Sequence, residues 1–160
     1  MFGKEKFSIT FLKEVLEAVS TLHDKIIEHS GGTKGIRDEG GVYNSTYKIL
    51  LYQEDHSDDP ASVGAFVYEE LARRHHFNDG NKRTAHAFAK LVLFLMDYHL
   101  KIEYKAAVPF IIEISKHDSK INFKEIKAWV KTHLIFIPEE YENNVEKYLK
   151  YVIEDTKYEN

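Results

Sequence analysis

A nine-residue stretch, HHFNDGNKR at residues 75–83, gathers the side chains that phosphate chemistry requires. It supplies imidazole, carboxylate, amide, ammonium and guanidinium groups, and only Phe77 and Gly80 are not polar. The segments on either side have the apolar spacing of buried helices. Such a density of polar groups between two helices predicts a functional loop.

The start of the second of these helices is expected to bind an anion. The first turn of a helix exposes unpaired N–H groups and a positive partial charge. Gly80 allows a left-handed backbone with its amides directed inward. Lys82 and Arg83 place two cations at this positive end, which costs stability unless an anion binds there. The pattern therefore predicts a phosphate ligand.

Other residues of the loop add groups that could act on that phosphate. Asp79 could hold Mg²⁺, which prefers one or two carboxylates together with phosphate oxygens and water. A histidine nearby could accept a proton from an attacking hydroxyl. Phe77 is expected to point inward and anchor the loop. Together these groups predict the transfer of a phosphate-containing group.

The elements that position the loop are predicted to form an all-α fold, a compact bundle around one central buried helix. That central helix is expected at Thr84–Tyr98, because its residues are apolar almost all round. His86 and Lys90 lie on one stripe with Lys82, either as a polar wall of the site or as a solvated face. The other expected helices run from a cap at Thr10 to Gly31, then over Val42–Gln53, Ala61–Arg74, Ala106–Lys116, Asn122–His133 and Glu139–Glu154, with one short extended segment at residues 101–105.

The composition limits the class of protein. The 160 residues suit one domain, and the absence of Cys excludes disulfides, thiolate zinc sites and a cysteine nucleophile. The longest apolar run, at residues 91–96, is too short to span a bilayer, so a cytoplasmic protein without membrane contact is expected. The net charge of −4 arises in the acidic segment 138–160, and no strongly basic face favours direct nucleic-acid binding.

The segment HHFNDGNKRTA resembles the Fic/Doc signature, in which His, Phe, an acidic residue, a small residue, Asn and Arg recur in that order. Lys82 makes it similar to the Doc, or death-on-curing, branch, whereas typical Fic proteins have Gly there. LHDKIIEHSGGTKGIRDEGG is similar to the Doc-type first helix and glycine-rich loop. The resemblance implies a Fic/Doc-like catalytic domain at residues 1–137. Residues 138–160 have no counterpart in it and are expected to form an acidic helical extension of the same domain.

The resemblance also implies a role for each residue of the motif. His75 would be the general base, Phe77 the core anchor and Asp79 the Mg²⁺ ligand. Gly80, Asn81 and Lys82 would form the phosphate-binding turn, and Arg83 would clamp phosphate. Gly80 stands where the best-known Doc motif has Ala.

The activity that this resemblance implies is that of a Doc-type toxin. ATP and Mg²⁺ would be used to place the γ-phosphate on a hydroxyl of a protein such as elongation factor Tu, which would inhibit translation. An antitoxin protein is the expected partner. Two alternatives stay open: Fic-type transfer of AMP to a protein, and a non-catalytic protein of the Fic fold that works through partner contacts.

Overall fold

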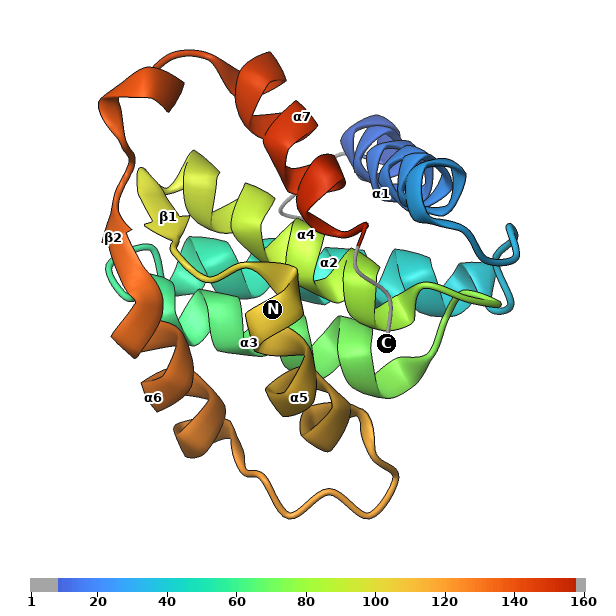
Figure 1. Ribbon diagram of the computed structural model, residues 1–160. Coiled ribbons are helices and arrows are strands. Elements are labelled where there is room, and N and C mark those ends of the chain that lie inside the picture. The colour runs from blue at the N-terminus through green and yellow to red at the C-terminus, as the bar shows by residue number, and fades with distance from the viewer. Residues whose placement is uncertain (1–8, 158–160) are drawn as a thin grey trace.

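The computed structural model of the chain describes residues 9–157, and within them the regular structure is helical apart from two short strands (Figure 1). The elements are α1 (Ile9–Ser30), α2 (Glu39–Asp55), α3 (Pro60–Arg74), α4 (Asn81–Leu95), β1 (Tyr98–Leu100), α5 (Tyr104–Ser115), α6 (Phe123–His133), β2 (Leu134–Phe136), the 3₁₀ turn η1 (Glu139–Tyr141) and α7 (Val145–Asp155). The predicted all-α bundle is confirmed. Among the described helices none is both long and apolar enough to cross a membrane.

The helices α3 and α4 form the centre of the bundle, and the remaining helices pack around them (Figure 1). Small side chains let these two helices approach closely: Ala85 and Ala89 are fully buried, and a Cβ on Gly64 would lie 3.1 Å from Leu93 Cδ1. The predicted central helix is confirmed, but it begins at Asn81 rather than at Thr84 and ends before Tyr98. It begins earlier because Gly80, in the left-handed region, is its N-cap.

Two short strands follow α4 and α6, where one extended segment was expected. β1 and β2 pair in antiparallel register, with Tyr98 opposite Phe136. The expected position at residues 101–105 is wrong, because α5 already begins at Tyr104. Asp97, with φ 73°, turns the chain directly from α4 into β1, a left-handed conformation that Asp tolerates better than most residues.

The acidic extension at residues 138–160 was predicted to contain one helix at Glu139–Glu154, but the structure has two elements in the part that it describes. η1 comes first, and α7 starts only after Asn144, whose side chain caps the Lys147 N–H. The buried face of α7, which includes Tyr148 and Val152, packs with residues of α1 and α4 in one hydrophobic cluster (Figure 1). Its described part, residues 138–157, is thus packed on the rest of the fold, and residues 158–160 lie outside the description.

A buried polar network joins α7 to α4. The Lys90 ammonium, fully buried, donates to the Tyr151 hydroxyl at 2.6 Å and lies 3.8 Å from the Asp155 carboxylate. His86 Nε2 lies 3.5 Å from the same carboxylate, which also accepts the Tyr104 N–H that begins α5. His86 and Lys90 are therefore neither a wall of the loop site nor a solvated stripe. They bind the C-terminal helix to the centre of the bundle.

The charges within this network follow from burial and proximity. Burial lowers the pKa of Lys90 to about 8 and that of His86 to about 4. Burial acts to raise the pKa of Asp155, but the hydrogen bond from His86 and the charge of Lys90 outweigh it, and the pKa lies below its ordinary value. At neutral pH one buried ammonium thus faces one buried carboxylate, with a neutral imidazole beside them.

Replacing Asp155 by Asn should destabilise the protein by about 3 kcal/mol, because the Lys90 ammonium is then buried without a counter-charge. Chemical denaturation at pH 7 measures this loss. The exposed neighbour Glu154, changed to Gln, should alter stability by less than about 0.5 kcal/mol. Adding Lys90→Met to Asp155→Asn should recover most of the loss, since the unpaired charge is gone. A double variant no more stable than the single one would contradict this account.

Acid should begin to destabilise the fold at a pH above the range in which carboxylates titrate. His86 and His99 are buried, and burial lowers the pKa of each to about 4. The unfolded chain, with histidine pKa values of about 6.5, binds more protons below that pH, so stability falls as pH drops from about 6.5 to about 4, by up to about 3 kcal/mol per histidine. Urea unfolding across this range measures the slope. His99→Leu should reduce it, and His29→Gln, at an exposed site, should not.

Candidate active site

The loop between α3 and α4 is held by the glycine-rich segment that follows α1. The two run antiparallel, with a β-bridge between Ile36 and Phe77. The Asn78 N–H donates to the Gly35 carbonyl at 3.0 Å, and the His76 carbonyl accepts the N–H groups of Arg37 and Asp38. The backbone of the loop therefore has a defined path although it belongs to no regular element.

Two side chains fix the middle of the loop from inside. Phe77 is 2% exposed and packs with Val19 and Val42, so its ring lies in the interior of the fold. The Asn81 side chain forms two 3.0 Å hydrogen bonds with Phe77, accepting its N–H and donating to its carbonyl. Asn81 thus closes the loop on itself, and its amide group is directed at backbone rather than outward.

The start of α4 has the features expected of an anion site. Gly80 takes the left-handed conformation, φ 74° and ψ 20°, and no side chain caps the helix. The first turn contains no acidic residue, and it carries Lys82 and Arg83 instead. An uncapped helix start with two basic residues attracts a negatively charged ligand.

Asp79 lies at the edge of this helix start with its side chain 47% exposed. Its carboxylate accepts the Thr33 N–H at 3.1 Å and the Gly80 N–H at 2.8 Å. The Thr33 hydrogen bond first, and then the Gly80 N–H and the nearby Arg83 charge, lower the pKa of Asp79 below its ordinary value. The carboxylate is ionised at neutral pH and accessible, as a metal ligand must be.

Arg83 is among the most deeply buried side chains of the described chain, at 2% exposure. Its Nη1 donates to the Ser30 hydroxyl at 2.6 Å and to the Gly31 carbonyl at 2.9 Å, and its Nη2 lies 3.9 Å from Asp79. A cation at the C-terminal end of α1 stabilises the negative end of that helix. Arg83 therefore connects α1, the glycine-rich segment and Asp79 in this structure.

His75 ends α3 and lies on the other side of the loop. Its backbone is left-handed, φ 52° and ψ 50°, an uncommon conformation for a residue other than glycine. The exposed imidazole directs Nε2 at the Ser115 carbonyl at the end of α5, at a long 3.4 Å. A carbonyl only accepts, so Nε2 carries the proton and Nδ1 keeps its lone pair. The structure brings Asp79 and Arg83 together, but it places the His75 side chain against α5.

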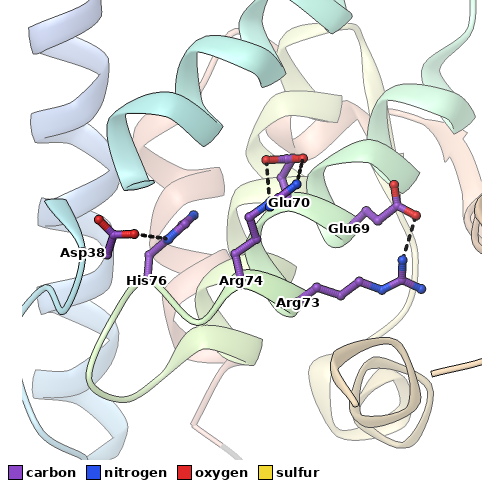
Figure 2. Close-up of a pocket in the computed structure, with 6 residues that line it drawn as sticks. All are labelled: Asp38, Glu69, Glu70, Arg73, Arg74 and His76. Atoms are coloured by element: carbon purple, nitrogen blue, oxygen red, sulfur yellow. Dashed lines mark hydrogen bonds and ion pairs between the residues drawn. The ribbon is translucent and has the colours of Figure 1, made fainter. Parts of the chain in front are cut away.

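The neighbouring His76 is buried and lines an open cleft of about 540 Å³ with Asp38 and the last two turns of α3 (Figure 2). Its Nε2 lies 2.8 Å from the Ser45 hydroxyl, which in turn donates to Glu70 at 2.9 Å. Arg74 pairs with Glu70 across the cleft wall. A second i,i+4 ion pair, Glu69 with Arg73, lies on the same helix, and Glu70 itself is buried.

Asp38, His76 and Ser45 are neighbours in space in the acid–histidine–serine arrangement of a hydrolase triad, but their geometry does not support that chemistry. The Asp38 carboxylate is 3.8 Å from His76 Nδ1, too far for a hydrogen bond, and Ser45 is 1% exposed with its proton directed at Glu70. A nucleophile must reach a substrate. Asp38 instead caps α2 by accepting the Gly41 N–H, and the network holds His76 in place.

The residues around Asp79 suit Mg²⁺ bound together with a phosphate ligand. Among the described residues no three His, Cys, Asp or Glu side chains come together as a complete metal cage. Mg²⁺ bound by one carboxylate takes its other ligands from phosphate oxygens and water. An accessible ionised Asp79 beside an uncapped helix start matches that donor set.

Two groups of site residues are not predicted from the sequence: His23, which carries a weak signal, and the pair Ser45 and Glu70, which carries none. His23 follows Val19 by four positions on the apolar face of α1, a polar residue where an aliphatic one is expected. That break marks it as a buried histidine with a specific partner. The roles of Ser45 and Glu70 depend on the packing of α2 against α3, and no local pattern predicts them.

The fold and the loop define a helical protein whose central helix begins at a left-handed glycine without a side-chain cap. The sequence profile of the Fic/DOC family matches residues 12–93, just over half of the chain and the whole of the loop. The chain belongs to the Fic/DOC family, whose members are usually transferases that act on proteins. A search of curated proteins finds no match.

Replacing Gly80 by Ala should lower stability by about 1–2 kcal/mol, since a left-handed conformation is costly for a residue with a Cβ. That Cβ would also lie 3.0 Å from Ile27 Cδ1. Gly31→Ala is the matched control: its φ is also positive, at 95°, but no atom outside its chain neighbours lies within 4 Å of the added carbon. Thermal unfolding should show the larger loss at Gly80. An unaffected Gly80 variant would argue against this helix cap.

Proposed function

We propose that this protein is a Mg²⁺-dependent phosphotransferase of the Doc type, which moves the γ-phosphate of ATP to a hydroxyl of a protein target. Elongation factor Tu is the target that the Doc resemblance suggests, and inhibition of translation in the cytoplasm is the consequence. The single observation that supports the proposal most directly is the uncapped start of α4, with Gly80 left-handed, Lys82 in the first turn and the Asp79 carboxylate beside it.

In this proposal the turn at Gly80, Asn81 and Lys82 binds the phosphates. The first-turn N–H groups of α4 supply donors, and Lys82, which is partly exposed, supplies mobile positive charge. Asp79 would hold the Mg²⁺, which neutralises charge on the phosphates when bound. Arg83 adds positive charge from its buried position, and a direct clamp on phosphate requires it to exchange its contacts with Ser30 and Gly31.

His75 is the proposed general base. Its imidazole is exposed, so a protein substrate can reach it, and its Nδ1 has the free lone pair. The base takes the proton of the target hydroxyl as the oxygen bonds to the γ-phosphorus. The bond from that phosphorus to the β–γ bridging oxygen breaks, and ADP leaves. The left-handed backbone of His75 supports a functional role, because such strained positions cluster at active sites.

The choice of the γ-phosphate depends on Lys82. In Doc proteins, which the motif resembles, a lysine at this position accompanies ATP bound in the reversed orientation, so that the γ-phosphate faces the base. Transfer of AMP by the same residues is the alternative, and a non-catalytic protein that uses this loop for partner contacts is a further one. An antitoxin that binds the protein is part of the Doc-type proposal.

The proposal is tested by incubating the purified protein with elongation factor Tu, Mg²⁺ and ATP labelled at either the α- or the γ-phosphorus. Label should pass to the target from the γ position only. His75→Asn should reduce transfer by at least about 100-fold, since general-base catalysis contributes about 10²–10⁴. Asn tolerates a left-handed backbone, so this variant should remain folded.

His117→Asn is the control for that experiment, because His117 is exposed and follows Ser115 by two residues. It should transfer label at the wild-type rate. Transfer from the α position would instead establish the adenylyltransferase. If no nucleotide binds and no label moves with any candidate target, the non-catalytic alternative replaces the proposal.

A further inference from the structure

His23 is a buried histidine of α1 that contacts the loop from beneath. Its side chain is 1% exposed, in the line of apolar residues that includes Val19 and Ile26. The imidazole stacks on the Phe77 ring, with 4.0 Å between ring centroids and 9° between planes. A polar ring buried to this degree requires a hydrogen-bond partner.

That partner is the backbone of the loop. His23 Nε2 lies 2.6 Å from the carbonyl oxygen of Asp79. Since the carbonyl only accepts, Nε2 carries the proton and donates it. Nδ1 lies on the side of Asp24, 3.8 Å from its carboxylate, which is half-exposed. The imidazole of His23 therefore contacts two residues of the motif: its face stacks on Phe77, and its Nε2–H donates to the Asp79 carbonyl.

The hydrogen bond fixes the peptide group between Asp79 and Gly80. In a trans peptide the C=O and the N–H point in opposite directions. With the carbonyl turned inward to His23, the Gly80 N–H points away from it and is donated to the Asp79 carboxylate at 2.8 Å. One buried donor thus sets both the direction of the amide that opens α4 and the position of the carboxylate.

Histidine combines two functions here that no other side chain of similar size combines. A phenylalanine would keep a flat ring on Phe77 and lose the donor. A glutamine would keep an N–H donor and lose the stacked ring. The space is also limited, because a Cβ at Gly80 would lie 3.5 Å from His23 Nε2. The two substitutions therefore separate packing from hydrogen bonding.

We propose that His23 is a positioning residue for the phosphate site: by holding the Asp79–Gly80 peptide, it sets the geometry of the anion-binding turn and of the metal-binding carboxylate. This inference depends on the proposed function for its ligand, Mg²⁺-ATP, and on the structure alone for the hydrogen bond. His23 acts through the loop and does not itself touch the reacting atoms.

The test compares His23→Phe with His23→Gln, and both with His29→Gln, an exposed histidine of the same helix. Calorimetry measures Mg²⁺-ATP binding, thermal unfolding measures stability, and amide hydrogen exchange measures protection of Gly80 and Asn81 without nucleotide. His23→Phe should bind Mg²⁺-ATP about tenfold more weakly than the wild type, because a buried carbonyl loses its donor and the turn loses its orientation. His23→Gln should stay within about threefold, and His29→Gln should match the wild type.

Three results would overturn the inference. The first is that His23→Phe binds Mg²⁺-ATP with wild-type affinity. The second is that both His23 variants lose affinity equally and in proportion to their loss of stability. The third is that the amide exchange rates of Gly80 and Asn81 do not change in His23→Phe. If the wild type itself does not bind Mg²⁺-ATP, the proposed function fails instead. The exchange experiment then decides the role of His23 alone: faster exchange in the Phe variant but not in the Gln variant supports it.

Discussion

The burial of three basic side chains on the central helix is the constraint on which the rest of the structure depends. Arg83, His86 and Lys90 lie on α4 and are each at most 2% exposed. A buried polar group is tolerated only with partners, and a buried charge needs an opposite one. Arg83 finds them at the end of α1, His86 at Tyr68 of α3 and at Asp155 of α7, and Lys90 at Tyr151 and Asp155 of α7.

This arrangement explains why the loop site has its present form. The hydrogen bond from Arg83 to the Gly31 carbonyl fixes the start of the glycine-rich segment. The backbone of that segment then pairs with residues 76–78 of the loop. Asp79 and Gly80 are then held between that segment and His23. The loop is therefore held by the glycine-rich segment and by His23, while the His75 imidazole is exposed and lies against the end of α5.

The sequence predicts the parts of this molecule that local patterns encode. The helical periodicity of apolar residues predicts a helical bundle and its central helix, and the order of residues from His75 to Arg83 identifies the loop. Periodicity cannot give the start of α4, because Gly80 decides it through a backbone angle. It also cannot give the partners of Lys90, since Asp155 lies 65 positions later in the chain. The orientation of the His75 ring depends on the end of α5, which no motif specifies.

The distance along the chain between Lys90 and Asp155 has a consequence for synthesis. The loop and α4 leave the ribosome long before the carboxylate that neutralises Lys90, because a chain is made from its N-terminus. Until α7 is available, the Lys90 ammonium lacks both Tyr151 and Asp155, and the hydrophobic cluster of α1, α4 and α7 is incomplete. The nascent chain should therefore delay assembly of its centre, and with it the ordered loop, until α7 has been synthesised.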